Sequence, residues 1–189
     1  MRSAIKSPSA YEPLRLGRMN TLAQQFARVE RLAEVAQSNG FTLWQLQELE
    51  GVAASYFVLI AQAEKGMGTA RGNALVEKAQ SKTFGATLRQ IAKAGLVSPE
   101  IVERFMKLLA ERNWLVHRSR ADSRNVIHND EAINLLLARL DAMAGESLAL
   151  LNFIDVKTTA FVRSHSISMD YIAEVSKQLL EQWHASKPL

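Results

Sequence analysis

Apolar residues recur every three or four positions along most of the chain, which is the pattern of amphipathic helices. From residue 21 this spacing continues up to a Ser-Asn-Gly sequence, which predicts a helix that ends with Gly40 as its C-cap. Thr42 is a typical N-cap residue and predicts the start of a second helix, which runs to about residue 64. This second helix is strongly apolar in its later part, so we expect it to lie centrally.

The rest of the chain has the same helical periodicity. Residues 74–94 predict a helical stretch that is broken near the sequence SKTFG. Gly95 as a C-cap, Ser98 as an N-cap and Pro99 at the first helical position then predict a helix that continues to about Arg118. A further helix is predicted from residue 130, with an apolar stripe up to Ile154, until the sequence RSHSIS breaks the chain, and a last helix is predicted over 169–184. No stretch alternates as a strand would. The sequence therefore predicts an all-α fold, a bundle of about six helices.

The domain organisation follows from where this periodicity begins. Residues 1–18 are polar, contain Pro8 and Pro13 and show no periodicity, so we expect a mobile basic tail. Residues 19–186 are predicted to form a single helical domain, because the chain has 189 residues and no linker-like stretch interrupts it. The glycine-rich sequence KGMGTARG lacks the spacing of a phosphate-binding loop and is predicted to be a turn between helices.

Composition excludes several classes of site. The chain has no cysteine, which rules out disulfides, thiolate nucleophiles and cysteine zinc sites. No histidines and carboxylates have metal-ligand spacing, so neither a metal nor another cofactor is expected. The longest uncharged apolar run, GVAASYFVLIAQA, has 13 residues, too few to span a bilayer, and no signal-peptide run is present. We expect a cytoplasmic protein without membrane contact.

The sequence RNWLVHRSR at residues 112–120 carries the candidate chemistry. At about 100° per residue, Arg112 falls inside the apolar arc of the predicted Pro99–Arg118 helix, and Asn113 and His117 are neighbours at the rim of this arc. An arginine in an apolar seam needs carboxylates, carbonyls or phosphates around its guanidinium group. A structural explanation stays open: Arg112 extends to solvent or pairs with Glu48 or Glu50, and His117 caps the helix.

These residues resemble the R-X4-6-H motif of the HEPN superfamily, with four residues between Arg112 and His117 and the common asparagine at Asn113. The resemblance covers residues 42–154 and implies a HEPN-like helical bundle. It also implies a metal-independent ribonuclease, in a toxin–antitoxin or defence system, that acts as a homodimer. Arg112 would then stabilise the charged phosphorane, His117 would transfer protons, and Asn113 would orient His117 or donate to a phosphate oxygen. Toxins that are silenced by tyrosine modification carry H-x-Y, whereas this chain has Ser119, so we do not expect that control by an antitoxin.

Positive charge lies next to the motif. Arg118, Arg120 and Arg124 follow it, with Asp122 as the single acid, and a basic loop of this kind suits the phosphates of RNA. An ordinary solvated loop is the alternative interpretation. The predicted homodimer places the Pro99–Arg118 helix at or near the two-fold axis, with Phe105, Leu108 and Trp114 as candidates for the contact.

Two other functions are compatible with the sequence. The first is a non-catalytic HEPN-like interaction or regulatory module, in which Arg112 and His117 are structural. The second is a helix-turn-helix DNA-binding protein, because TLRQIAKAGLVSPEIVERFM has two helices of suitable length around a glycine turn. Glu100 and Glu103 at the start of the would-be recognition helix oppose this second function, because DNA phosphates repel them.

Overall fold

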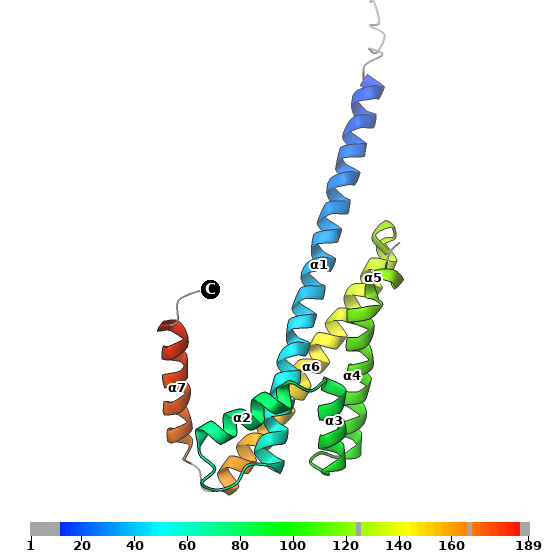
Figure 1. Cartoon of the computed structure of the whole chain (residues 1–189). Helices are drawn as coiled ribbons and strands as arrows, with labels where there is room; N and C mark the ends of the chain where they lie inside the picture. The colour runs from blue at the N-terminus through cyan, green and yellow to red at the C-terminus, as the bar shows by residue number, and fades with distance from the viewer. Residues whose placement is uncertain (1–11, 124–125, 166–167, 186–189) are drawn as a thin grey trace, which may run out of the picture. The chain divides into compact units, whose positions relative to one another are not determined.

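The computed structural model describes residues 12–123, 126–165 and 168–185, and these residues form only helices and turns (Figure 1). The seven α-helices and one 3-10 turn of the described residues are α1 Glu12–Ala61, α2 Thr69–Gln80, α3 Phe84–Lys93, α4 Pro99–His117, α5 Ser119–Asp122, η1 Val126–His128, α6 Asp130–Ser164 and α7 Met169–Ala185. The predicted all-α class is confirmed. The break near SKTFG, the start at Pro99 and the start near Asp130 are confirmed as well.

The predicted break around Gly40 is wrong, because α1 continues through it as one helix. The side chain of Thr42 does not cap a helix N-terminus. It is buried, and its hydroxyl donates a hydrogen bond of 3.3 Å to the carbonyl of Leu140 on α6. Tertiary packing therefore outweighs the cost of a helical glycine, which is about 1 kcal/mol. The helix begins at Glu12, so residues 12–18 of the predicted mobile tail are helical, and residues 1–11 lie outside the described residues.

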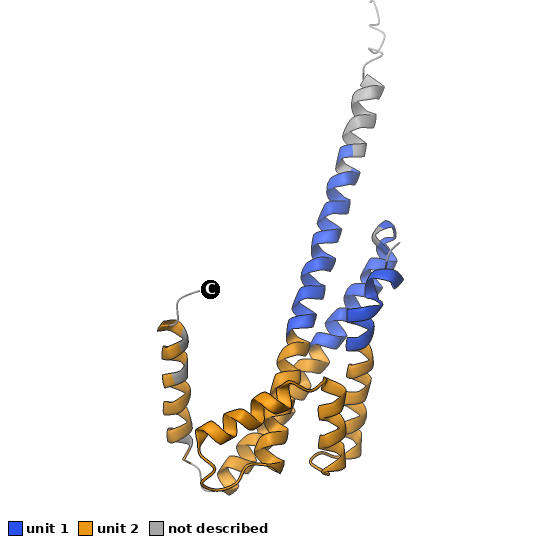
Figure 2. Ribbon diagram, viewed as in Figure 1, with its two compact units in different colours: residues 1–44, 112–144 blue, residues 45–111, 145–189 orange. Residues whose placement is uncertain are grey.

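The chain forms two compact units (Figure 2), and α1, α4 and α6 contribute residues to both. Unit 1 comprises residues up to 44 together with 112–144, and unit 2 comprises 45–111 and 145–189. The single domain predicted for residues 19–186 stays a prediction.

Unit 1 has a small aliphatic core. Its buried side chains are Leu115 from the end of α4 and Ile133, Leu136, Leu140 and Met143 from α6. The start of α6 is fixed by Asn129, whose side-chain oxygen accepts hydrogen bonds from the backbone N–H groups of Glu131 and Ala132 at 3.0 and 3.2 Å. Arg31 of α1 makes an ion pair with Asp130 at this same helix end. Unit 1 thus pairs one side of α1 with the N-terminal part of α6.

Unit 2 has a core that contains aromatic residues. Phe84 of α3 and Phe105 of α4 meet edge to face with ring centroids 6.4 Å apart, and both are buried. Gly85 lets these two helices approach closely, because a Cβ there would lie 3.2 Å from Cδ2 of Leu109. The polar edge of the unit is held by Arg104, whose guanidinium donates to both carboxylate oxygens of Glu146 at 2.7 and 3.0 Å.

The turn between α3 and α4 explains why the local sequence predicted this boundary correctly. Gly95 has a φ of 63°, which is the left-handed conformation that glycine adopts without strain. The N–H groups of Gly95 and Leu96 bond to the carbonyls of Ala92 and Ile91 at 3.1 and 3.2 Å, which is the Schellman arrangement. Pro99 then begins α4 with no need of its missing N–H.

Candidate functional site

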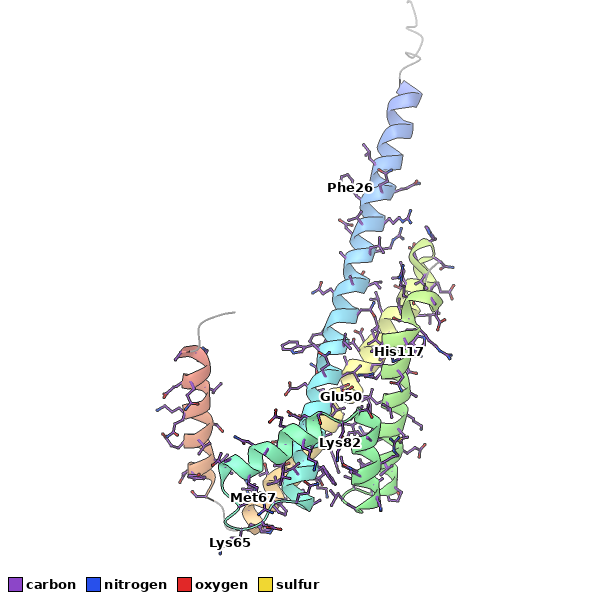
Figure 3. All side chains as sticks on the ribbon, viewed as in Figure 1. Phe26, Glu50, Lys65, Met67, Lys82 and His117 are labelled. Carbon is purple, nitrogen blue, oxygen red and sulfur yellow. The ribbon has the colours of Figure 1, made fainter. Side chains whose placement is uncertain are left out.

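The candidate motif occupies the last turns of α4, within unit 1. The helix ends at His117, and the N–H of Arg118 still bonds to the carbonyl of Trp114 at 2.8 Å. Asn113 and His117 are both exposed and lie one helical turn apart, so they share one face (Figure 3 labels His117). The two residues are therefore neighbours on α4, and their roles in a site stay a prediction.

Arg112 lies on a different side of the helix. It is half-buried and is engaged in polar or electrostatic contact. It lies five positions before His117, which corresponds to about 140° around the helix axis. One copy of α4 therefore presents Asn113 and His117 on the same exposed face. The side chain of Arg112 projects from a different, half-buried face. Pairing of Arg112 with Glu48 or Glu50 stays a prediction.

The apolar arc of α4 is narrower than the sequence suggested. By helix geometry Met106 and Val116 fall within this arc, yet their side chains are 43% and 44% exposed. Phe105 and Leu108, expected near a dimer contact, are only 2% and 3% exposed, because they pack into the core of unit 2. That expectation is wrong for both residues. An arc of about 180° cannot reveal from sequence which part of it faces the core.

Trp114 anchors the end of the motif helix. The guanidinium carbon of Arg139, on α6, lies 3.4 Å from the centroid of the indole ring, which is a close cation–π contact. The indole Nε1–H donates a hydrogen bond of 2.8 Å to Oδ2 of Asp122 on α5. Sequence reasoning missed these partners of Trp114, because no local spacing links it to Arg139. They hold α4, α5 and α6 together beside His117.

The segment after the motif was predicted as a loop, but the structure places the helical turn α5 and the 3-10 turn η1 there. Ser119, two positions after His117, donates its hydroxyl to the carbonyl of Leu115 at 2.5 Å. This bond satisfies a carbonyl at the end of α4 and explains why the chain turns compactly at this point. Ser119 thus has a structural partner in the motif helix.

Two of the three predicted phosphate-binding arginines can be placed. Arg118 and Arg120 are exposed on either side of Ser119, and Arg124 lies outside the described residues. Asp122, the single acid of this segment, already accepts the indole hydrogen bond of Trp114. The surface next to His117 therefore carries two guanidinium groups that are accessible to solvent.

Two further features concern metal ligands and membrane-spanning helices. Among the described residues, no three histidines, aspartates or glutamates gather as metal ligands would. Within the same residues, no helix is both long enough and apolar enough to cross a membrane.

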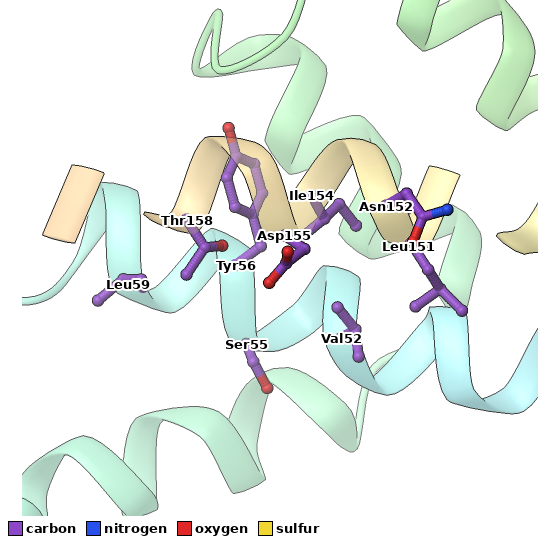
Figure 4. Close-up of a pocket in the computed structure, with 9 residues that line it drawn as sticks. All are labelled: Val52, Ser55, Tyr56, Leu59, Leu151, Asn152, Ile154, Asp155 and Thr158. Carbon is purple, nitrogen blue, oxygen red and sulfur yellow. The ribbon is translucent and has the colours of Figure 1, made fainter. Parts of the chain in front are cut away.

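Unit 2 contains a groove of about 470 Å³ between α1 and α6 (Figure 4). Val52, Leu59, Leu151 and Ile154 make its walls largely apolar, and Asp155 adds one carboxylate. The Tyr56 hydroxyl donates to the carbonyl of Leu96 at 3.1 Å, and burial raises the pKa of Tyr56, which keeps this donor protonated. With a single acid and no basic partner among its lining residues, the groove lacks an acid–base pair.

Compared with family models, curated proteins and solved structures, the chain matches none of them.

Proposed function

We propose that the chain is a metal-independent endoribonuclease of HEPN type. In this proposal it acts in the cytoplasm as a homodimer, and two sets of Arg112, Asn113 and His117 surround one RNA phosphate. The observation that carries the proposal is the shared exposed face of Asn113 and His117 at the C-terminal end of α4. An imidazole that solvent reaches is suited to proton transfer.

The reaction requires two proton transfers. A base removes the proton of the ribose 2′-OH, whose oxygen attacks the adjacent phosphorus, and an acid protonates the departing 5′-oxygen. The products are a 2′,3′-cyclic phosphate and a 5′-hydroxyl. A single motif helix supplies one imidazole, so a second copy of His117 is needed if histidines perform both transfers. Arg112 stabilises the pentacoordinate phosphorane, because a planar guanidinium donates to two phosphate oxygens at once.

The surroundings of the motif suit this arrangement. Exposed Arg118 and Arg120 supply positive charge for the flanking phosphates. Val116, exposed next to His117, offers an apolar contact to the second copy of α4, in place of the buried Phe105 and Leu108. In a toxin–antitoxin or defence setting, a cognate antitoxin or regulatory protein would restrain the activity.

The test is RNA cleavage in EDTA by the full chain and its variants. We expect His117→Ala and Arg112→Ala to lower the cleavage rate by about 10²–10⁴-fold, and Arg112→Lys to restore little of it. The matched control is His128→Ala, because His128 is also an exposed histidine of unit 1 but lies outside the motif. Equal cleavage by His117→Ala and His128→Ala would overturn the proposal, as would complete loss of activity in EDTA.

One observation favours a second candidate function, a non-catalytic HEPN-like interaction module. Arg112 is half-buried and engaged, as a structural arginine would be. In that case Arg112→Ala lowers the free energy of unfolding, and the wild-type chain does not cleave RNA. Thermal unfolding of Arg112→Ala, measured beside the cleavage assay, separates the two functions.

A further inference from the structure

The N-terminal part of α1 carries a continuous apolar stripe on its surface. Successive members are three or four residues apart and fall within about 80° around the helix axis. They are Leu22, Phe26, Val29, Ala33, Ala36, Gly40 and Trp44. All seven are exposed, and the four largest, Leu22, Phe26, Val29 and Trp44, are 53%, 68%, 62% and 67% exposed. Figure 3 shows Phe26 projecting from α1. We call this surface the α1 stripe.

The rest of unit 1 packs against the opposite side of the same helix. Arg31, which pairs with Asp130 at the start of α6, lies about 180° from Leu22 around the axis. Thr42, which is buried against Leu140, lies on that side as well. Every side chain that the structure describes from residue 22 to residue 30 is exposed. From residue 31 to residue 44, α1 therefore has a covered side and a bare apolar side, and the described side chains of residues 22–30 are exposed all round.

A helix with an exposed apolar side lacks the packing that would stabilise it. Most helical stability in proteins comes from packing an apolar face, and a helix without such packing is marginal in water. Apolar residues spaced alternately three and four apart form the seam through which helices pair. The stripe follows this spacing from Leu22 to Gly40. Its chemistry therefore fits another helix with the same kind of seam.

The sizes of the residues indicate which helix this is. Between Leu22 and Gly40 the first three members of the stripe are large, namely Leu22, Phe26 and Val29, and the last three are small. If a second copy lies antiparallel with its centre at residue 31, Leu22 faces Gly40, Phe26 faces Ala36 and Val29 faces Ala33. Each large side chain of this span then meets a small one, and Trp44 lies beyond it. A Cβ placed on Gly40 would meet nothing within 4 Å, so there is room above this residue.

Charge along the helix agrees with the antiparallel direction. With the centre at residue 31, Arg28 of each copy lies at the same height as Glu34 of the other. Antiparallel packing also opposes the helix dipoles.

We propose that the α1 stripe is a self-association surface, where α1 of a second copy of this chain packs antiparallel. The stripe lies on the side of α1 away from α6, so this contact is separate from the α4 contact of the proposed ribonuclease. It stands without that function, and a mutation in one contact leaves the other in place. If both contacts form, the chain assembles beyond a dimer.

The first experiment measures the mass of the full chain in solution by light scattering. Phe26→Asp should halve the mass, because a carboxylate in the seam is buried without a partner. The matched control is Leu135→Asp, since Leu135 on α6 is also 68% exposed but lies outside the stripe, and its mass should equal that of the wild type. Val116→Asp tests the α4 contact separately. A monomeric wild type, or an unchanged mass for Phe26→Asp, would overturn the proposal.

The second experiment fixes the direction of pairing and uses the absence of cysteine from the chain. Phe26→Cys and Ala36→Cys are each oxidised alone and then as a mixture. Antiparallel pairing predicts a disulfide-linked dimer in the mixture and none in either variant alone, because residue 26 of one copy lies about 15 Å along the axis from residue 26 of the other. Dimers in each variant alone would indicate parallel helices, and no disulfide in any sample would indicate no contact. Both results contradict the proposal.

Discussion

The two compact units place their aromatic residues differently. Unit 2 buries Tyr56, Phe57, Phe84 and Phe105, whereas in unit 1 Phe26, Phe41 and Trp44 are at least half exposed. The core of unit 1 is aliphatic and small. Hydrogen bonds of the Trp114 and Asn129 side chains add polar contacts to it. Burial of aromatic surface dominates the energetics of a core, so unit 2 has the stronger internal packing.

This difference links the stability of the fold mainly to unit 2 and recognition mainly to unit 1. The candidate motif and the α1 stripe both belong to unit 1, and the stripe leaves Leu22, Phe26, Val29 and Trp44 more than half exposed. Extended exposed apolar surface is a common mark of interaction sites. We therefore expect substitutions in unit 2 to act mainly on the free energy of unfolding, and many substitutions on the surface of unit 1 to act on association or activity.

The largest expected effect is in the aromatic core. Phe105→Ala removes a ring that is almost fully buried and should lower the free energy of unfolding by about 3–5 kcal/mol. Phe41→Ala, in unit 1, should lower it by less than about 1 kcal/mol, because half of that ring is already in contact with water. Chemical denaturation of both variants makes the comparison. Equal losses would show that the two units do not differ in this way.

A smaller effect is expected in unit 1 at Thr42. Thr42→Val keeps the shape of the side chain but removes the buried hydroxyl that donates to the Leu140 carbonyl, which should cost about 1 kcal/mol. Thr69→Val is the control, since Thr69 is exposed at the start of α2. Urea denaturation measures both. If the two variants are equally stable, the hydrogen bond to Leu140 does not hold α1 against α6.

The contact between Trp114 and Asp122 should contribute less, because both side chains are at least partly exposed. Trp114→Phe keeps a ring beneath Arg139 and loses the indole donor, so we expect a loss of about 0.5 kcal/mol. A double-mutant cycle with Asp122→Ala isolates this interaction from other consequences of each change. Zero coupling in the cycle would rule out the indole bond as an anchor of the motif helix.

The smallest effect concerns pH. The hydroxyl of Ser98, together with a backbone hydrogen bond, lowers the pKa of Glu100 in the folded chain. A lowered folded pKa means that the stabilisation is present above the ordinary pKa of a glutamate and is lost as the pH falls through the lowered value. Ser98→Ala should raise the pKa of Glu100 part of the way back, and Ser98→Thr should preserve it. A carboxyl titration followed by NMR would detect this, and an unmoved pKa in Ser98→Ala would contradict it.

Local signals predicted the helix boundaries that depend on local chemistry. Ser98, Pro99 and Gly95 mark the turn before α4 because caps and φ angles are properties of neighbouring residues. The continuity of α1 through Gly40 could not be predicted in this way. It depends on Thr42 meeting Leu140, which lies 98 positions away along the chain.

The same distinction applies to the candidate site. The one-turn spacing of Asn113 and His117 is enough to predict that they share a face. Which part of the apolar arc of α4 faces the core depends on the other helices. Phe105 was expected near a dimer contact and is buried, whereas Val116 falls within the apolar arc and is exposed. The stacking of Arg139 on Trp114 has no signature in the sequence for the same reason.

The close approach of α3 and α4 at Gly85 limits which substitutions this position can accept during evolution. A methyl group added there would lie 3.2 Å from Leu109, so it is accommodated only if the leucine gives way. Among descendants of this chain, a larger residue at position 85 should therefore be accompanied by a smaller or differently shaped one at position 109. The two positions are expected to covary, although 24 residues separate them in the chain.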